Sequence, residues 1–418
     1  MEYGCIGKKL PHSFSKIIHE KIGDYSYKLV ELSEEELPKF MENRDFKAIN
    51  VTIPYKEAVI PYLYEMSDTA KSIGAVNTVV NRDGKLYGYN TDFYGMTALI
   101  KKNSIDFNGK KVAVLGTGGT SKTANAVAKN LGAKTVIKVS RNKSDCTVTY
   151  SELYSEHSDT DIIINTTPVG MFPQIYASPV DLSRMSSLSG VIDAVYNPLE
   201  TKLVADVKKR GIPAESGLYM LVAQAIKAYE IFMDKTAPEN LLDNIFNDVK
   251  SQKQNIVLIG MPGSGKTTVG QAVAEKLGRE FIDTDIEIKK VIKTEISDYF
   301  SQYGEEKFRD VETQVIKDIA KRSGAVIATG GGAVLRQENI DALKMNGIIY
   351  FLDRPLSEIV PTSDRPTASS REAIEKRYNE RYGIYKASAD KIVTVTGVVN
   401  DAVKQIESEH FKNENSCY

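Results

Sequence analysis

Short apolar runs alternate with polar, helix-forming stretches over the first hundred residues. Runs at 3–6, 25–32 and 48–53 predict strands, and the glutamate-rich segment 33–43 predicts a helix between the last two. Turn-forming residues at 81–84 predict a hairpin. Strands and helices in alternation are typical of a parallel sheet, so we expect this segment to form an α/β domain.

The same alternation returns in the middle of the chain, where a glycine-rich turn joins a strand to a helix. Strands are expected at 110–115, 134–139, 161–165 and 191–196. The first of them runs into Gly116–Gly119, and an alanine-rich helix follows to about Leu131. Strand, glycine turn and helix form the dinucleotide-binding arrangement of a Rossmann domain. Ser121 occupies the place of the third glycine in G-x-G-x-x-G, so this motif alone is a weak signal.

A second and more specific glycine motif begins another domain. The apolar run 256–259 leads into Gly260–Thr267, which follows the P-loop pattern and precedes an apolar helical pattern. Backbone N–H groups of such a loop bind phosphate oxygens, Lys266 would reach the β- and γ-phosphates, and the Thr267 hydroxyl would hold Mg²⁺. The predicted phosphate-binding residues are Gly263, Ser264, Gly265, Lys266, Thr267 and Thr268.

Composition and charge agree with several globular domains. A chain of 418 residues suggests two to three domains, and 42% of its residues are apolar and 26% charged. A net charge of −1 gives no basic footprint for nucleic acid. The chain shows no signal peptide and no apolar run of membrane-spanning length. Three widely spaced cysteines fit a reducing cytoplasm. We therefore expect a cytoplasmic protein without nucleic-acid or membrane partners.

Several polar residues of the first segment admit two interpretations. Ser13 and Ser15 precede a helical pattern, so they are either helix caps or ligands of a polar substrate. Lys56 follows a strand and a proline turn, where a solvated surface charge is the ordinary case. Asn77 and Asp92 lie in stretches typical of turns and helix caps. Residue type and spacing leave these alternatives open.

Four motifs taken together are more specific. HSFS, NVTIPYK, GAVNT and NTDFYG, in this order, resemble shikimate dehydrogenase, and the resemblance continues to about Leu242. It implies that Lys56 and Asp92 form the catalytic pair, since a positioned ammonium stabilises the charge that hydride delivery leaves on a ketone oxygen. The implied substrate contacts are Ser13, Ser15, Thr52, Asn77, Asp92, Tyr196 and Gln224.

The resemblance extends to the dinucleotide turn, because the family's own pattern, GxGG, is met. The implied cofactor contacts are Gly116, Gly118, Gly119, Thr120, Ser140, Thr166 and Gly217. An NAD site usually carries an acidic residue after the second strand of the domain, whereas Arg141 and Lys143 stand here and suit the 2′-phosphate of NADP. The alternative is an exposed basic turn. We expect NADP(H) as the cofactor.

The last segment resembles shikimate kinase in the motifs GxPGSGKTT, DTD, GEExFR and GGGAV. Asp283 and Asp285 are expected at a strand end and on the same side, with helix capping as the alternative. The resemblance assigns Asp283 to Mg²⁺ together with Thr267, and Asp285 to shikimate and to catalysis. It further implies that shikimate contacts Arg309, Gly331 and Gly332, that its carboxylate contacts Arg381, and that a lid residue, Arg365, joins Lys266 at the ATP phosphates. The lid connection looks short, so the adenine-stacking residue has no assignment.

Domain boundaries follow from both resemblances. Residues 1–101 are expected to form a substrate-binding domain that helices in 218–250 complete. A Rossmann domain is expected at 102–217 and a P-loop kinase domain at 254–412. The polar residues 250–254 are interpreted as a short linker.

The combined resemblance is to a fusion of two enzymes of one pathway. It implies NADPH-dependent reduction of 3-dehydroshikimate, followed by transfer of the ATP γ-phosphoryl group to shikimate in the presence of Mg²⁺. One alternative is a dehydrogenase of broader range that also accepts quinate with NAD and carries a kinase-like sensor domain. The arginine and lysine at the expected 2′-phosphate position argue against it.

Overall fold

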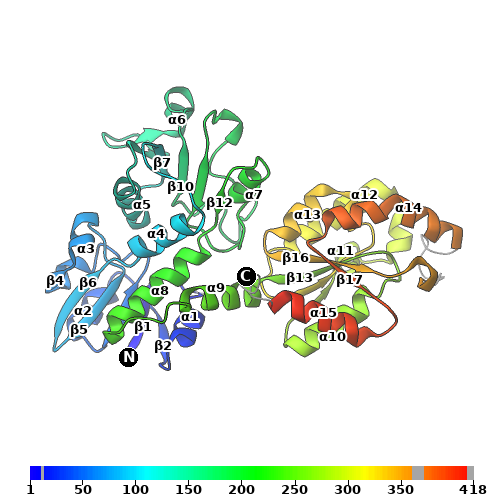
Figure 1. Cartoon of the computed structure of the whole chain (residues 1–418), viewed down its shortest axis with the longest axis horizontal. Coiled ribbons are helices and arrows are strands. Elements are labelled where there is room, and N and C mark those ends of the chain that lie inside the picture. Colours follow the sequence, from blue (N-terminus) through cyan, green and yellow to red (C-terminus); the bar gives the residue numbers. More distant parts are fainter. Residues whose placement is uncertain (11–13, 360–370, 412–418) are drawn as a thin grey trace. The chain divides into compact units, whose positions relative to one another are not determined.

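The chain forms two compact α/β units. The computed structural model describes residues 1–10, 14–359 and 371–411, and the units are Met1–Val249 and Lys250–Tyr418 (Figure 1). The first unit contains two six-stranded sheets and the second contains one five-stranded sheet. Within the described ranges, no helix is long and apolar enough to cross a membrane.

The first sheet has the strand order β2-β1-β3-β5-β6-β4. Its strands are β1 (Tyr3–Gly7), β2 (Tyr27–Glu31), β3 (Ala48–Val51), β4 (Glu65–Met66), β5 (Thr78–Arg82) and β6 (Lys85–Tyr89). Strand β1 pairs in parallel with β2 and β3, as the alternation predicts. The predicted hairpin is present as β5 and β6, and it makes the pairs β3/β5 and β5/β6 antiparallel, so the sheet is mixed rather than parallel.

Helices cover both faces of this sheet because successive strand side chains point to opposite faces. They are α1 (Ser15–Ile22), α2 (Glu36–Asn43), α3 (Asp68–Ile73), α4 (Asp92–Lys102) and, from later in the chain, α8 (Leu218–Met233). Ile6 and Ile49 pack with α2 and α3 in one apolar cluster. A separate cluster joins Ile18 of α1 to Val222 of α8. The return of the chain in α8 brings residues beyond 217 back to the first sheet.

The second sheet is parallel throughout, in the order β12-β11-β10-β7-β8-β9. Its strands are β7 (Lys111–Leu115), β8 (Thr135–Ser140), β9 (Val148–Thr149), β10 (Ile162–Asn165), β11 (Gly190–Asp193) and β12 (Ala214–Glu215), with helices α5 (Gly119–Asn130), α6 (Tyr150–Glu156) and α7 (Lys202–Lys208). Val112 and Val114 pack with α4 and α5, whereas Ala113 and Leu115 pack with α6 and α7. The strand order reverses between β7 and β10, where ligands bind in such folds.

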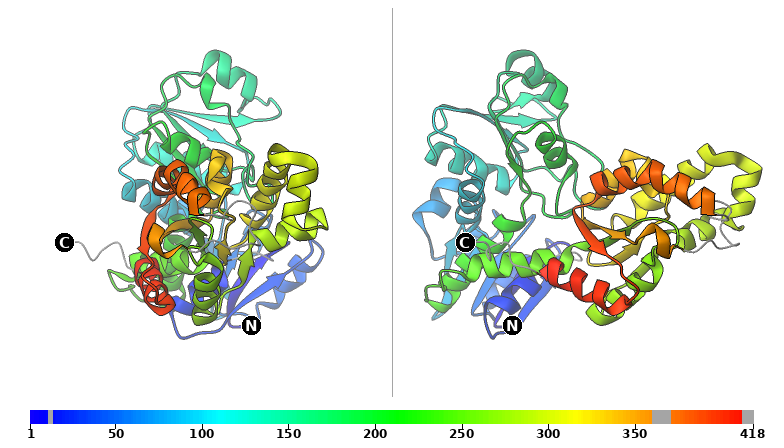
Figure 2. Two further views of the ribbon diagram at one scale, coloured as in Figure 1. Left: turned by 90° about the vertical axis from the view of Figure 1, so that its right-hand side faces the viewer. Right: turned by 45° about the vertical axis from the view of Figure 1, so that its right-hand side comes forward.

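The second unit is built on five parallel strands in the order β14-β15-β13-β16-β17. The strands are β13 (Asn255–Ile259), β14 (Phe281–Asp283), β15 (Val326–Ala328), β16 (Gly347–Asp353) and β17 (Lys391–Thr394). The helices are α10 (Lys266–Leu277), α11 (Thr284–Ile292), α12 (Ile296–Ile319), α13 (Gln337–Lys344), α14 (Arg371–Ser388) and α15 (Val399–Phe411). Helices α10 and α15 pack side by side on one face, and α12, α13 and α14 lie over the other (Figures 1 and 2).

Four single turns of 3₁₀ helix complete the described structure, at Ile60–Tyr62, Leu182–Arg184, Ala333–Leu335 and Leu356–Glu358.

Helix α9 (Leu241–Lys253) corrects the prediction of a linker at 250–254. Its apolar residues Ile245 and Val249 pack in the core of the first unit. The carbonyl oxygen of Ser251 accepts a hydrogen bond from Arg279, and the carbonyl oxygen of Lys253 accepts one from the backbone of Gly324. The polar residues are therefore helical and bound to the second unit. Polar composition alone does not distinguish an exposed helical turn from a linker.

Candidate active sites

Lys56 and Asp92 meet as an ion pair although 36 positions separate them. Lys56 lies in the turn after β3, and Asp92 is the first residue of α4. The Lys56 Nζ atom donates to Asp92 Oδ2 at 2.5 Å, and the two side chains are 12% and 10% exposed. Lys56 is therefore not a solvated surface charge. Partial removal from water strengthens the attraction, so the carboxylate holds the ammonium in one position.

Asn77 and Gln224 lie next to this pair in a buried polar network. The backbone N–H of Thr91 donates to Asn77 Oδ1 at 2.7 Å, and because a backbone N–H can only donate, this contact determines the orientation of the Asn77 amide. Its Nδ2 atom then donates to Thr91 Oγ1 at 3.0 Å and faces Gln224 Oε1 at 3.4 Å. Two predicted substrate ligands from distant parts of the chain thus lie together.

Gly95 explains how helices α4 and α8 approach each other. A Cβ atom at this position would lie 2.5 Å from the carbonyl oxygen of Met220 and 3.0 Å from the Cβ atom of Gln224. A larger residue would therefore push the two helices apart. The sequence pattern around Gly95 suggested a turn, whereas the structure places this glycine inside α4, where it sets the spacing between Asp92 and Gln224.

Ser15 follows Phe14 in the chain, and the ring of Phe14 contacts the ring of Tyr196. Ser15 is the first residue of α1, and the N-cap position belongs to Phe14, so helix capping does not account for this serine. The rings of Phe14 and Tyr196 lie 5.2 Å apart. Burial raises the pKa of Tyr196 to about 12, so its phenol remains a hydrogen-bond donor at neutral pH. Thr52 is half-buried just after β3, and Ser13 lies outside the described residues.

The dinucleotide turn lies beside the lysine. Gly116 has φ of 107°, and a Cβ atom there would lie 2.9 Å from Thr166 Oγ1, so only glycine fits. The Ser121 hydroxyl donates to the carbonyl oxygen of Gly116 at 2.6 Å, which closes the turn where the common pattern has a third glycine. A Cβ atom at Gly119, the first residue of α5, would lie 3.4 Å from Lys56 Cδ. The turn and the candidate catalytic lysine therefore belong to one site.

Of the remaining predicted cofactor residues, Thr166 lies beside the same turn, and the others lie at the starts of α5 and α8. Thr166 donates its hydroxyl to the carbonyl oxygen of Leu115 at 2.5 Å. Gly217 is the N-cap of α8, and a Cβ atom there would lie 2.4 Å from the carbonyl oxygen of Ala194. Gly118 is the N-cap of α5, and Thr120 is the second residue of that helix.

The two basic residues in the turn after β8 differ in their contacts. Ser140 ends the strand, and Arg141 and Lys143 are exposed. Lys143 forms an ion pair with Glu152, and this hydrogen-bonded contact is the main reason that the pKa of Glu152 falls to about 2. Because the Lys143 ammonium already has a protein partner, the structure supports Arg141 more strongly than Lys143 as a ligand for an added phosphate.

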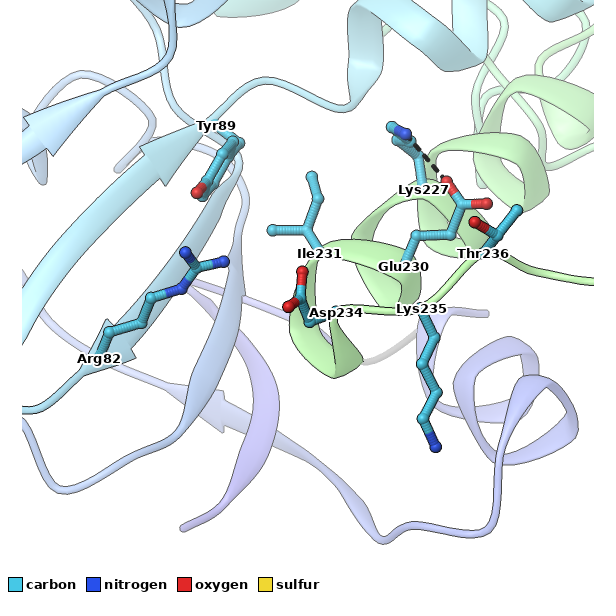
Figure 3. A pocket seen from close by; sticks show the side chains of 8 residues that line it. All are labelled: Arg82, Tyr89, Lys227, Glu230, Ile231, Asp234, Lys235 and Thr236. Carbon is cyan, nitrogen blue, oxygen red and sulfur yellow. Dashed lines mark hydrogen bonds and ion pairs between the residues drawn. The ribbon is translucent and has the colours of Figure 1, made fainter.

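A separate pocket lies between the hairpin β5–β6 and the carboxyl end of α8 (Figure 3). Its volume is about 350 Å³ and its lining residues are Arg82, Tyr89, Lys227, Glu230, Ile231, Asp234, Lys235 and Thr236. None of the predicted site residues lines it. We therefore do not associate it with the candidate active site of this unit.

The P-loop of the second unit has the backbone that its glycines predict. Gly260, Gly263 and Gly265 have φ angles of 151°, 84° and 93°, a region that favours glycine. Lys266 begins α10, and its Nζ atom donates to the carbonyl oxygens of Gly260 at 2.9 Å and Met261 at 3.0 Å. The ammonium therefore lies inside the loop. Ser264 is buried at its base, and Thr268 is exposed in the first turn of α10.

Asp283 and Asp285 are placed differently from each other. Asp283 Oδ2 accepts the Thr267 hydroxyl at 2.9 Å, and its Oδ1 atom accepts the backbone N–H of Asp285 at 3.0 Å, so Asp283 caps α11 and also contacts the P-loop. The expectation that both acids end a strand is wrong for Asp285, because the strand stops at Asp283 and Asp285 lies in the first helical turn. Its Oδ1 atom would lie 2.7 Å from a Cβ at Gly330, so it faces the glycine loop.

Arg309 lies under the glycine loop in a network that includes a residue that we did not single out from the sequence. Its Nη1 atom donates to Glu312 at 2.6 Å, and its Nε and Nη2 atoms donate to Glu305 at 3.3 and 3.1 Å. Glu312 is 1% exposed, and burial raises its pKa despite the arginine. The i, i+3 spacing from Arg309 was the available signal. A Cβ atom at Gly332 would lie 2.2 Å from Arg309 Nη1, so a larger residue there would displace the guanidinium.

Arg381 approaches the same loop from α14. Its Nη1 atom donates to the carbonyl oxygen of Gly331 at 3.2 Å, and the Tyr385 hydroxyl donates to the same oxygen at 2.5 Å. The structure thus brings Arg381 to the loop that Asp285 and Arg309 also face. Arg365, the predicted lid arginine, lies outside the described residues.

Comparisons with known proteins agree with both resemblances. A shikimate kinase family model matches residues 262–409, and a model of the shikimate dehydrogenase substrate-binding domain matches residues 5–79. The NADP⁺ shikimate dehydrogenase of Clostridium beijerinckii is 38% identical over 260 residues, which cover 59% of this chain and 96% of that protein.

Two solved structures extend the comparison. Shikimate dehydrogenase 1 from Peptoclostridium difficile has 38% sequence identity and a TM-score of 0.56, and the match covers 60% of this chain and 98% of that one. Shikimate 5-dehydrogenase from Thermus thermophilus, in complex with NADP(H) and shikimate, has 26% identity and a TM-score of 0.54, with coverage of 59% and 99%.

Proposed function

Because the chain belongs to the shikimate dehydrogenase family and also carries a shikimate kinase domain, we propose that it catalyses two consecutive reactions. The first unit reduces 3-dehydroshikimate to shikimate with NADPH. The second transfers the γ-phosphoryl group of ATP to shikimate, giving shikimate 3-phosphate and ADP. The observation that carries the proposal is the presence in one chain of the Lys56–Asp92 pair and of a P-loop whose Thr267 contacts Asp283.

In the first reaction, NADPH supplies a hydride when bound. Addition of hydride to the ketone carbon leaves negative charge on the ketone oxygen. The Lys56 ammonium stabilises that charge and donates a proton to the oxygen. Asp92 holds the ammonium at 2.5 Å and also accepts a hydrogen bond from a substrate hydroxyl. Lys56 then recovers a proton from solvent, because its side chain is 12% exposed.

The residues around this pair orient the substrate. Asn77 and Gln224 are placed to bind ring hydroxyls, and their orientations are held by backbone groups of Thr91 and Leu221. Thr52 adds a hydroxyl contact from the end of β3, and Tyr196 adds one from beyond β11. Ser15, the first residue of α1, and Ser13, which lies outside the described residues, bind the carboxylate of the substrate.

The residues present fit an NADP cofactor. The positive φ of Gly116 and the absence of a side chain at Gly119 let a pyrophosphate approach the N-terminus of α5, which favours anions. Gly118, Thr120 and Thr166 border this turn, and Gly217 lies at the start of α8. Arg141 follows Ser140 in the exposed turn after β8 and suits the 2′-phosphate.

In the second reaction, Lys266 contacts the β- and γ-phosphates, and the backbone of Gly263–Gly265 binds phosphate oxygens. Two protein oxygens fit Mg²⁺, because the Thr267 hydroxyl and an Asp283 carboxylate oxygen lie 2.9 Å apart beside the loop and Mg²⁺ prefers oxygen ligands. Mg²⁺, when bound, neutralises phosphate charge. Phosphoryl transfer depends mostly on positioning and charge neutralisation, which the loop supplies.

The acceptor lies at the glycine loop. Asp285 faces Gly330 and orients the attacking hydroxyl of shikimate, and it is the residue placed to accept the proton of that hydroxyl. Arg309, Arg381 and the backbone of Gly331 and Gly332 bind the rest of shikimate. The resemblance assigns a further phosphate contact to Arg365, which lies outside the described residues.

One observation favours testing a second candidate. The pairing of Lys143 with Glu152 leaves Arg141 as the main basic residue for a 2′-phosphate, which is the feature expected if NAD is also accepted. A dehydrogenase of broader range would then reduce NAD with quinate as well as shikimate. Comparing kcat/KM for the four combinations of NADP or NAD with shikimate or quinate distinguishes the two candidates.

The proposal is tested on the whole chain with two single-site variants. NADPH oxidation is measured with 3-dehydroshikimate, and ADP formation is measured with shikimate and MgATP. We expect Lys56→Ala to abolish the first reaction and leave the second, and Lys266→Met to do the reverse. Absence of either reaction from the unmodified chain, or loss of both reactions in one variant, would contradict the proposal.

A further inference from the structure

A row of polar side chains on α14 faces the glycine loop of the second unit. Arg381 and Tyr385 both donate to the carbonyl oxygen of Gly331. Arg377 precedes Arg381 by four residues, and Ile374, one turn earlier, is buried. Residues three and four apart share one face of a helix, so Arg377 lies on the inward face of α14 together with the residues that bind the loop.

Arg377 carries a donor that the protein does not use. Its Nη1 atom is buried and has no hydrogen-bond partner among the described residues. Burial, and secondarily the positive charge of Arg381, lower the pKa of Arg377, and the acidic groups that act on it are Glu380 and Glu305. A buried donor without a partner is costly, because it has lost its hydrogen bonds to water. A bound anion would remove that cost.

Arg309, a further arginine of the site, is paired with two carboxylates. Arg309 directs three of its nitrogen atoms to the carboxylates of Glu305 and Glu312, with distances of 2.6 to 3.3 Å. Because two protein carboxylates accept hydrogen bonds from this guanidinium, only part of its donor set is left for a ligand. Further positive charge next to Gly331 comes from α14.

We propose that Arg377 is a substrate-binding residue of the kinase unit, which contacts the carboxylate of shikimate together with Arg381. This inference rests on the proposed kinase reaction. Two guanidinium groups one helical turn apart can take the two oxygens of one carboxylate, whereas a single guanidinium in contact with Gly331 has part of its donor set occupied.

The first test is Arg377→Gln, with Lys376→Gln as the matched control, since Lys376 is exposed on the neighbouring face of α14. Initial rates of ADP formation report the second unit alone, and dehydrogenase activity of the same chain measures the concentration of folded protein. Hydrogen bonds to charged groups support an expectation that KM for shikimate rises about tenfold or more in the Arg377 variant. KM for ATP should change less than about twofold, and Lys376→Gln should match the unmodified chain.

The second test asks whether the carboxylate is the partner of Arg377. The methyl ester of shikimate lacks the negative charge, so the unmodified chain should use it with much lower kcat/KM than shikimate. In Arg377→Gln the ratio of the two kcat/KM values should shrink about tenfold, and Arg377→Lys should restore part of it. An unchanged ratio, or equal losses for acid and ester, would overturn the inference. A chain that phosphorylates shikimate but shows no change in Arg377→Gln refutes only this inference, whereas an unmodified chain that does not phosphorylate shikimate refutes the proposed function.

Discussion

Replacement of Lys56 by alanine should stop reduction of 3-dehydroshikimate while leaving substrate binding almost intact. The ammonium is the one cation that contacts Asp92, at 2.5 Å in the described structure, and a water molecule in its place would carry no positive charge and would be a much weaker acid. Removing a positioned proton donor costs about 10² to 10⁴ in rate, so the loss in kcat should be at least about a hundredfold. A hundredfold loss corresponds to about 2.7 kcal/mol of transition-state stabilisation.

The assay for this variant is steady-state NADPH oxidation with 3-dehydroshikimate. KM should change by less than about fivefold, since a loss confined to kcat is the signature of an interaction made in the transition state. The contacts of Asn77 and Gln224 do not depend on the lysine, which is the structural reason for that expectation. Kinase activity of the same chain provides the control for folding. A kcat within threefold of the unmodified chain, at equal kinase activity, would refute the assignment of Lys56 as proton donor.

Three further predictions concern the cofactor, the pH dependence of stability and the independence of the units. Arg141→Asp should move the preference from NADP toward NAD by about tenfold or more in the ratio of kcat/KM values, and an unchanged ratio would remove Arg141 from the 2′-phosphate site. Burial lowers the pKa of His19 to about 3, below its unfolded value of 6.5, so stability that is complete above pH 6.5 should be lost as the pH falls, by up to about 2.7 kcal/mol at pH 4.5. Urea unfolding should show a smaller loss in His19→Phe, and identical pH profiles would contradict this. Fragments 1–249 and 250–418 should each fold and keep their own reaction, because each retains its own core, and an inactive fragment would show that the units depend on each other.

The position of the cut in that last experiment depends on the structure. Polar residues at 250–254 indicated a linker, and the sequence alone would place the cut after Ser251. The carbonyl oxygen of Ser251 accepts one hydrogen bond from Arg279 and contacts His410, so a cut after Ser251 would remove two contacts of the second unit. Helical continuity of α9 could not be predicted, because it depends on partners that lie 28 and 159 positions away in the chain.

Local motifs made most of the fold predictable. The strand, glycine turn and helix at Gly116 and at Gly260 are short-range patterns, so their positions agree with the sequence prediction. The hairpin at 81–84 was also predicted, although its effect on the sheet, a change from parallel to antiparallel pairing, was not. That effect depends on which strand the hairpin joins, and nothing within the hairpin specifies its neighbour.

The candidate sites were predictable only in part, because their residues meet through tertiary structure. Lys56 and Asp92 were paired by family resemblance, since a separation of 36 positions carries no physical signal of its own. The strand predicted through Asp285 stops two residues earlier because Asp283 caps a helix there. Glu312 was missed although its i, i+3 spacing from Arg309 was an available signal, whereas Lys143 and Glu152 lie nine positions apart and leave no periodic pattern.

A single coupled measurement tests whether one chain carries out both reactions in sequence. The whole chain is supplied with labelled 3-dehydroshikimate, NADPH and MgATP, and NADPH oxidation, ADP formation and labelled shikimate 3-phosphate are followed together. If both reactions occur on this chain, one ADP and one labelled shikimate 3-phosphate should form for each NADPH oxidised once shikimate reaches steady state. In a second reaction with added unlabelled shikimate, the labelled fraction of shikimate 3-phosphate should fall, because the two sites act independently. NADPH oxidation that yields only shikimate, with no ADP and no phosphorylated product, would contradict the account.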